Sequence, residues 1–136
     1  MPSTIPLGVA IYENPEILHW SLFIDAANKA EKTIVHIIGA RQKFFPQIRT
    51  PSDARESTAL IELVDLCQIN AADAKRIKNL AYAMPIRNEN PDYSCQDYVL
   101  DLLELLEDKG IVVATLEYKD RKRVLAAKRQ SWKNVG

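Results

Sequence analysis

Histidine, cysteine and long apolar runs are scarce in this sequence. Its 136 residues include two histidines and two cysteines, and no window approaches eighteen consecutive apolar residues. A membrane-spanning helix needs about 20 such residues, and the N-terminus lacks the basic and apolar regions of a secretory signal, so we expect a soluble, cytoplasmic protein. Cys67 and Cys95 are therefore expected to be reduced. Neither cysteine lies at zinc-motif spacing from His19 or His36, so no metal site is predicted.

Positive and negative charges balance overall but are separated along the chain. The 18 Lys and Arg residues equal the 18 Asp and Glu residues in number. Residues 119–136 hold seven of the basic residues and one acidic residue, Asp120, which leaves residues 1–118 acidic. No basic stripe with interleaved aromatic residues crosses the chain, which excludes a nucleic-acid-binding domain. The basic segment predicts either a solvated or ion-paired surface helix or a weak contact with an anionic membrane.

Hydrophobic patterning predicts a single α+β domain with an antiparallel sheet and helices. Short runs rich in β-branched and aromatic residues predict strands at 7–12, 17–24 and 33–40. Residues 41–57 contain two prolines and scattered charge, and are predicted to form an irregular loop that could act as a lid. The apolar segment 58–69 fits a strand and a helix about equally, and we favour a strand because a clearer helix follows directly.

Two helices are predicted in the second half of the chain. The first, 70–84, has Asn70 as N-cap and one apolar face at helical spacing. The second, 95–110, begins after Ser94, with Asp97 three residues later in a variant of the capping box. Residues 111–118 are rich in β-branched side chains and predict a further strand. The surface helix expected beyond them would pack through three apolar side chains, Val124, Leu125 and Trp132.

Cys95 occupies the first position of the second predicted helix. Free N–H groups and the helix dipole at such a position favour a thiolate. If residues 24 and 33 lie opposite each other in a hairpin, His19 and His36 project from the same side, about one diagonal neighbour apart. The three residues then provide a base, an orienting group and a nucleophile. The alternative is that His19, His36 and Cys95 are packing residues without a catalytic role. Cys67 is expected to lie in the core.

Three short motifs resemble a known family. The stretches HWSLFI, TIVHIIG and YSCQDYV are similar, in this order, to motifs of the lecithin:retinol acyltransferase-like family, which includes the H-Ras-like suppressor phospholipase/acyltransferases. That family has a strand beginning His-Trp-Ala, a second strand histidine and an Asn-Cys-Glu-His-Phe-Val helix start. Here Ser94, Gln96 and Asp97 depart from the pattern. The resemblance implies a circularly permuted papain-like catalytic domain over residues 1–118, followed by a basic C-terminal tail or helix over 119–136.

The resemblance also implies an activity, that of a cysteine-dependent hydrolase or acyltransferase. Cys95, with a pKa lowered by the helix terminus and an imidazolium, would attack the carbonyl of an acyl ester, thioester or amide; His19 would move the proton and His36 would orient His19. Helix N–H groups would supply part of an oxyanion hole. No cofactor is needed, and the substrate would be a small-molecule or lipid acyl compound. Further candidates for oxyanion or substrate contacts are Tyr12, Trp20, Tyr93 and Gln96.

Two alternatives to that activity stay open. The PPPDE-type deSUMOylating isopeptidases have a similar permuted arrangement but use a Cys/His dyad, so the second histidine, His36, favours the acyltransferase-like branch. A catalytically silent interaction module, with the basic tail as its functional part, belongs to a different class. A thiol-directed probe near neutral pH separates this module from the enzymes, and acyl-ester against SUMO-conjugate turnover separates the two enzymes.

Overall fold

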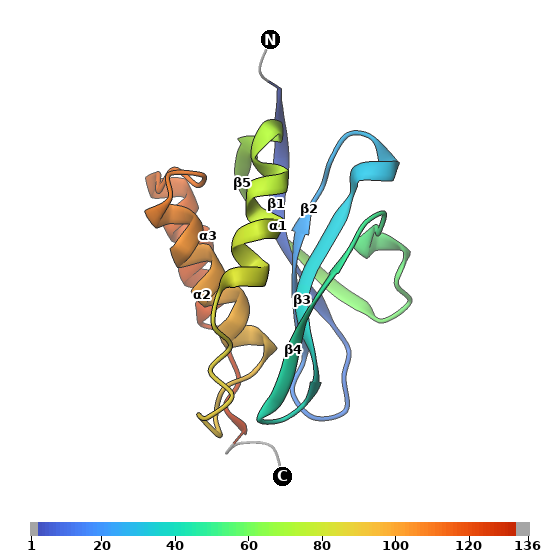
Figure 1. Ribbon diagram of the computed structural model, residues 1–136, viewed down its shortest axis with the longest axis vertical. Coiled ribbons are helices and arrows are strands. Elements are labelled where there is room, and N and C mark those ends of the chain that lie inside the picture. The colour runs from blue at the N-terminus through green and yellow to red at the C-terminus, as the bar shows by residue number, and fades with distance from the viewer. Residues whose placement is uncertain (1–2, 133–136) are drawn as a thin grey trace.

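Five antiparallel strands form one sheet in the order β4-β3-β2-β1-β5. The computed structural model describes residues 3–132. The strands are β1 (Thr4–Tyr12), β2 (His19–Ile24), β3 (Thr33–Ala40), β4 (Lys43–Arg49) and β5 (Leu60–Asn70). The helices are α1 (Ala74–Ala83), α2 (Cys95–Asp108) and α3 (Leu116–Ala126), and they gather on one side of the sheet (Figure 1). The predicted α+β class with an antiparallel sheet in a single domain is confirmed.

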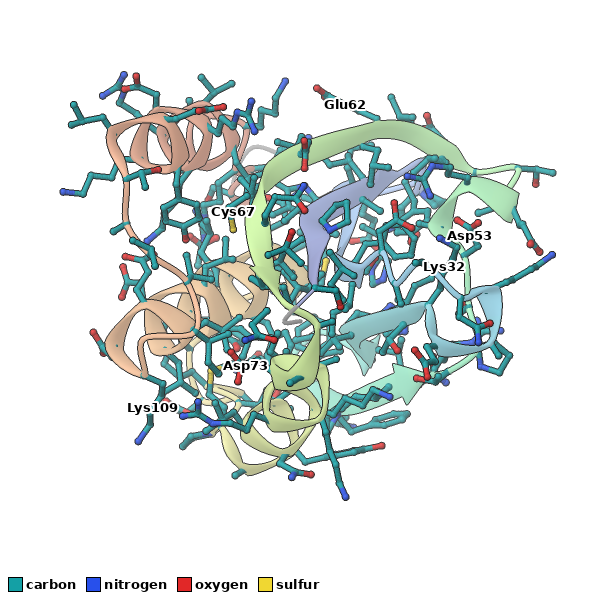
Figure 2. The ribbon with its side chains drawn as sticks, turned by 90° about the horizontal axis from the view of Figure 1, so that it is seen from above. Lys32, Asp53, Glu62, Cys67, Asp73 and Lys109 are labelled. Carbon is teal, nitrogen blue, oxygen red and sulfur yellow. The ribbon has the colours of Figure 1, made fainter. Side chains whose placement is uncertain are left out.

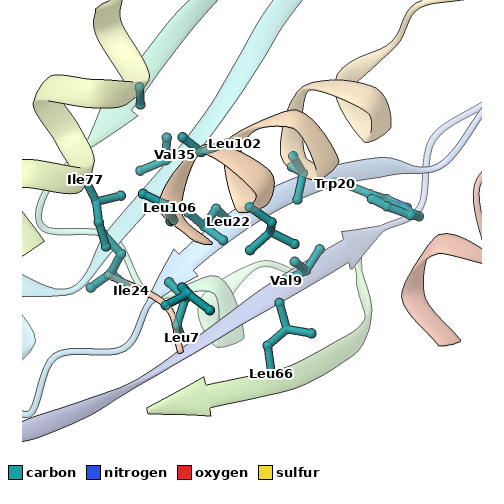
Figure 3. Packing of buried hydrophobic residues seen from close by; sticks show 14 of the residues in the cluster. Leu7, Val9, Trp20, Leu22, Ile24, Val35, Leu66, Ile77, Leu102 and Leu106 are labelled. Carbon is teal, nitrogen blue, oxygen red and sulfur yellow. The ribbon is translucent and has the colours of Figure 1, made fainter. Parts of the chain in front are cut away.

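The core lies between this sheet and the helices. Leu7, Leu22 and Val35 from three strands pack with Leu102 and Leu106 of α2 in one buried cluster (Figure 3). Alternation along each strand sends every second side chain toward the helices. Burial of such side chains contributes roughly 1.5–3 kcal/mol each. The cluster therefore fixes α2, and with it the helix N-terminus, against β2 and β3.

The pairing of β2 with β3 decides where the two histidines lie. Ile24 is opposite Thr33 and Leu22 is opposite Val35, which is the predicted register. Because Leu22 and Ile24 face the helices, alternation places His19 on the other face of β2. The paired residues stop at Leu22, so the two strands separate at the end that carries His19.

The outer face of the sheet is partly covered by the connection between β4 and β5. Ala54 in this connection is buried in a second, smaller cluster with Ala10, Tyr12, Phe23 and Ile34. Figure 2 shows Asp53 and Lys32 on the side of the sheet away from α2 and α3. The outer face thus has its own cover and is not simply a solvent-exposed surface.

Two predicted segments are wrong. Residues 43–49, predicted as part of a loop, form β4, because β4 is an edge strand and an edge tolerates Pro46. Residues 111–118, predicted as a strand, form a short irregular stretch followed by α3, since the Thr115 Oγ1 accepts a hydrogen bond from the N–H of Tyr118 and begins a helix. The segment 58–69 is a strand as favoured, with bounds Leu60–Asn70.

The two predicted helix starts are close to those observed. Ser94 and Asp97 form a complete capping box at α2. The Asn70 side chain accepts from the N–H of Ala72 at the start of a short 3-10 turn, which leads into α1. Local side-chain chemistry therefore determines where each of these two helices begins.

The basic C-terminal segment is a surface helix followed by a turn and an irregular stretch. Leu125 is buried and Trp132 is half-buried, as predicted, whereas Val124 is 57% exposed, so its predicted packing is wrong. Most of the basic side chains pair with acidic residues of the body or of α3 itself; the pairs are Arg121 with Asp65 and Glu117, Lys122 with Glu107, Arg123 with Asp120, Lys128 with Glu62, and Arg129 with Asp92 and Asp97. Lys133 and the rest of the tail lie outside the described residues.

Candidate active site

Cys95 is the first residue of α2, and the capping box fixes its position. The Ser94 side chain accepts from the N–H of Gln96 at 3.1 Å, and the Ser94 N–H donates to the Asp97 carboxylate at 2.9 Å. The thiol donates to the carbonyl of Leu18, with 3.8 Å between Sγ and O. Cys95 thus reaches the residue that directly precedes His19. Within residues 3–132, this carbonyl rather than an imidazole is the hydrogen-bond partner of the thiol.

Burial sets the protonation state of the thiol. Cys95 is 7% exposed, and its burial raises the pKa to about 11, although backbone N–H groups of Trp20, Gln96 and Cys95 itself favour the thiolate. The sequence-based prediction of a lowered pKa is therefore wrong for the resting protein, because desolvation outweighs the helix terminus. At neutral pH the resting group is a thiol.

His19 and His36 form a direct pair on the outer face of the sheet, as their predicted same-side register requires. The Nε2 of His19 lies 2.7 Å from the Nδ1 of His36, and the rings meet edge to face with centroids 4.9 Å apart. Burial lowers the pKa of His19 to about 4, with a further lowering from His36, and burial also lowers the pKa of His36. Both imidazoles are therefore neutral at pH 7.

Gln47 fixes the direction of the hydrogen bonds in this pair. Its Oε1 lies 2.8 Å from the Nε2 of His36, and a carbonyl oxygen only accepts, so this Nε2 carries the proton. Neutral His36 then accepts at Nδ1 from the Nε2–H of His19. In neutral His19 the remaining nitrogen, Nδ1, consequently bears a free lone pair. The chain from Gln47 through His36 leaves His19 in a tautomer that can act as a base at Nδ1.

A cavity of about 590 Å³ brings His19 and Cys95 to one space, since both residues line it. Its other walls mix apolar and polar side chains, among them Asn14, Glu16, Ile17, Ile37, Phe44 and Trp132. The imidazole also borders a second cavity on the outer face of the sheet. His19 therefore lies between the cavity that contains Cys95 and the cavity on the outer face of the sheet. It is at the end of β2 where β2 and β3 separate.

Gln96 and Gln130 clamp the two segments that carry the candidate catalytic residues. The amide Nε2 of Gln96 donates to the Leu18 carbonyl at 2.9 Å and to the Gln130 Oε1 at 3.2 Å. The Gln96 Oε1 accepts from the Gln130 N–H at 2.7 Å, and the Gln130 Oε1 accepts from the Leu18 N–H at 2.8 Å. Gln96 is fully buried. Both of its amide hydrogens are occupied, so the side chain holds β2 and α2 together and has no donor left for a substrate.

The stretch 129–132, which we call the C-terminal strap, crosses the start of α2. Arg129 Nε donates to the Asp97 Oδ1 at 2.8 Å, and the indole N–H of Trp132 donates to the Tyr93 carbonyl at 3.0 Å. The Arg41 guanidinium stacks over the Trp132 ring, 5.1 Å from the ring centroid. The strap thereby forms one wall of the Cys95 cavity and belongs to the site.

None of the three aromatic candidates forms a hydrogen bond with the thiol through its side chain among residues 3–132. The Tyr12 hydroxyl bonds to the Ser21 Oγ at 2.9 Å, and Tyr12 lines the outer cavity. Trp20 lies in the core, and its backbone N–H rather than its ring favours the thiolate. Tyr93 is buried, and its hydroxyl has no hydrogen-bond partner within residues 3–132. A role of these three side chains in substrate binding stays a prediction.

Sequence patterning does not identify Gln47, Gln130 or Trp132 as site residues. Gln47 lies in β4, directly opposite His36. The sequence predicts a loop there because of Pro46, so it does not indicate that Gln47 faces a histidine. Gln130 and Trp132 lie in a tail whose most prominent sequence feature is its positive charge. Cys67, expected in the core, is half-buried, and burial raises its pKa to about 11. Both cysteines are free thiols.

Neither a metal cluster nor a membrane-spanning helix occurs in the described part of the chain. Among residues 3–132, no group of three or more His, Cys, Asp or Glu side chains could hold a metal ion. No helix within these residues has both the length and the apolar character to cross a membrane.

The fold and site define a class of protein: an α+β domain with a cysteine at a helix N-terminus and a histidine pair on neighbouring strands. Residues 7–113 match the model of a family of unknown function, DUF6540, and the chain belongs to this family. The match includes His19, His36, Gln47 and Cys95 and ends before the C-terminal strap. No curated protein and no solved structure matches the chain.

Proposed function

We propose that the protein is a thiol-dependent hydrolase or acyltransferase that forms an acyl-enzyme at Cys95. The observation that carries the proposal is the shared cavity: His19, held in a base tautomer by His36 at 2.7 Å, borders the same space as the buried thiol. A nucleophile, a base and an orienting group on three separate elements are the requirements of thiol acyl transfer. The motif resemblance to the lecithin:retinol acyltransferase-like family favours the same chemistry.

The proton path follows from the two pKa values. A thiol with a pKa near 11 and an imidazole with a pKa near 4 form a neutral resting pair, so the thiol proton passes to His19 Nδ1 while Sγ attacks the acyl carbonyl, rather than beforehand. Because the resting thiol bonds to the Leu18 carbonyl, it must turn toward the His19 ring, across the cavity that both residues line, to reach Nδ1. Catalytic hydrogen bonds commonly tighten only with substrate bound. His19 then returns the proton to the leaving group.

Backbone N–H groups at the start of α2 complete the mechanism. The Cys95 N–H favours negative charge at the thiol and is a donor for the oxyanion of the tetrahedral intermediate. One such donor is worth about 3–4 kcal/mol in comparable sites. Water as the second acceptor gives hydrolysis, and an amine or hydroxyl gives acyl transfer, with no cofactor required in either case.

The cavity walls favour a small acyl substrate. Ile17, Ile37 and Phe44 provide apolar surface beside the thiol, which suits a short acyl chain of an ester, thioester or amide. A cytoplasmic location and a contact of the basic tail with anionic lipid stay predictions; the ion pairs of α3 leave few of its cations free for such a contact.

A covalent thiol probe tests the proposal. The wild type should be labelled with chloroacetamide at Cys95 near neutral pH, and His19→Ala should slow this labelling by about 10²-fold, the lower end of general-base contributions. Cys67 is the internal control, because its pKa is equally raised but no histidine is its neighbour in the proposed mechanism. Labelling of both cysteines at rates that do not depend on His19 would contradict a catalytic thiol and favour the interaction module.

Substrate turnover then separates the two enzymatic alternatives. Hydrolysis or transfer from a p-nitrophenyl acyl ester supports the acyl-ester assignment. Cleavage of a SUMO conjugate without acyl-ester turnover would instead support an isopeptidase of the PPPDE type.

A further inference from the structure

The second cavity lies on the outer face of the sheet, away from the helices, and has a volume of about 470 Å³. Its floor is formed by side chains of several strands, among them Tyr12, His36 and Arg49, and its wall by the connection that follows β4. Most outward faces of a half-covered sheet carry side chains that simply extend into water. Here a covering segment and a hollowed polar floor together make a partly enclosed space of ligand size.

The charges around this cavity leave Arg49 without a partner. The cavity has two acidic residues, Asp53 and Glu56. Asp53 lies 3.4 Å from the Arg55 guanidinium, and Glu56 lies 2.9 Å from the Lys29 ammonium. Arg49, in contrast, has no ion pair within residues 3–132. Of the three charged residues that line the cavity, Arg49 is therefore the one without an ion pair in the described part of the chain.

The neutral groups beside Arg49 are hydrogen-bond donors. Ser57 Oγ already accepts from the N–H of Ala59, so its hydroxyl hydrogen is available to donate, and Ser52 adds a second hydroxyl to the lining. The positive charge of Arg49 reaches the floor, where it lowers the pKa of His36 in addition to the larger effect of burial, and of Tyr12 against the opposing effect of burial. A planar guanidinium with hydroxyl donors is suited to a carboxylate or phosphate group.

We propose that this outer cavity is an anion-binding site in which Arg49, with the hydroxyls of Ser52 and Ser57, holds a carboxylate or phosphate group beside the His19–His36 pair. The site lies on the opposite side of the histidine pair from the thiol cavity, so it is distinct from the acyl site. The proposal does not depend on thiol chemistry.

Titration of the intact protein with small anions tests this site. Inorganic phosphate and acetate are added at constant ionic strength, balanced with chloride, while NMR follows the Arg49 side-chain N–H and the His36 ring signals. We expect saturable shifts at both residues with a millimolar Kd. Arg49→Gln should weaken binding at least about tenfold, the value of one charge-assisted hydrogen bond. Arg76→Gln, an exposed arginine of α1 that pairs with Asp73, removes the same charge elsewhere and should leave binding unchanged.

Two further measurements complete the test. Cys95→Ser should bind the anions as the wild type does, so failure of the thiol mechanism leaves this proposal intact. A short-chain monomeric phospholipid, added in place of free phosphate, identifies a lipid headgroup as the source if it binds more tightly. The proposal is overturned if neither phosphate nor acetate gives saturable shifts, or if Arg49→Gln and Arg76→Gln weaken binding equally.

Discussion

Replacement of Gln96 by leucine should loosen the clamp between the two segments that carry His19 and Cys95. Leucine has nearly the same volume but has no amide, so the change deletes three hydrogen bonds of 2.9, 3.2 and 2.7 Å. The N–H of Gln130 loses its acceptor, and the carbonyl of Leu18 retains only the thiol. Each of the three lost hydrogen bonds is worth about 0.5–1.5 kcal/mol, so the free energy of unfolding should fall by about 2–4 kcal/mol.

Urea denaturation measures this loss. With a slope of about 2 kcal/mol per molar, typical of a small domain, the midpoint should move down by about 1–2 M. Gln68→Leu is the matched control, because Gln68 is exposed on β5 and its replacement should change stability by less than about 0.5 kcal/mol. If Gln96→Leu falls within the same small range as Gln68→Leu, the clamp does not hold β2 and α2 together as described. The labelling rate of Cys95 should drop in the same variant, since the Gln96 side chain no longer ties the start of α2 to Leu18, the residue before His19.

The remaining predictions concern the histidine pair and the thiol. Gln47→Leu removes the acceptor that fixes the tautomer of His36, so turnover should fall about two- to tenfold while the fold is retained. The ¹⁵N shifts of the imidazoles should then show mixed tautomers, and unchanged tautomer signals would refute this role of Gln47. His19 must be neutral to accept a proton, and with its pKa lowered to about 4 the activity should persist as pH falls to about 5 and decline only below that; a loss with a midpoint near 6.5 would contradict the burial of this ring. In His19→Ala, the labelling rate of Cys95 should rise continuously as the pH is raised toward 11. A plateau of the rate near neutral pH, which a pre-formed thiolate would give, would contradict the raised pKa.

Local patterns are sufficient to predict the parts of the site that depend on neighbours in sequence. The capping box of Ser94 and Asp97 places Cys95 at a helix start, and the alternation of β2 and β3 places His19 and His36 on one face. Gln130 is not predictable in this way, because its role comes from contacts with Leu18 and Gln96, which are distant in sequence.

Two other features depend on the tertiary environment. Residues 111–118 have strand-like composition, but Ile111 and Val112 are buried at the end of α2, and no sheet edge among the described residues receives them as a strand. The raised pKa of Cys95 could not be predicted, because a helix terminus is visible in the sequence and the burial of Cys95 in the core cluster is not. Pro46 likewise indicates a loop unless the strand is known to be at an edge.

Mass spectrometry of the protein during turnover of an acyl ester tests the central claim most directly. Rapid acid quenching in the steady state should trap one acyl group on the peptide that contains Cys95, with Cys67 unmodified. The adduct should be absent in Cys95→Ser and should form far more slowly in His19→Ala. An ester that is turned over with no acyl group on Cys95, or with turnover undiminished in Cys95→Ser, would contradict catalysis by this thiol.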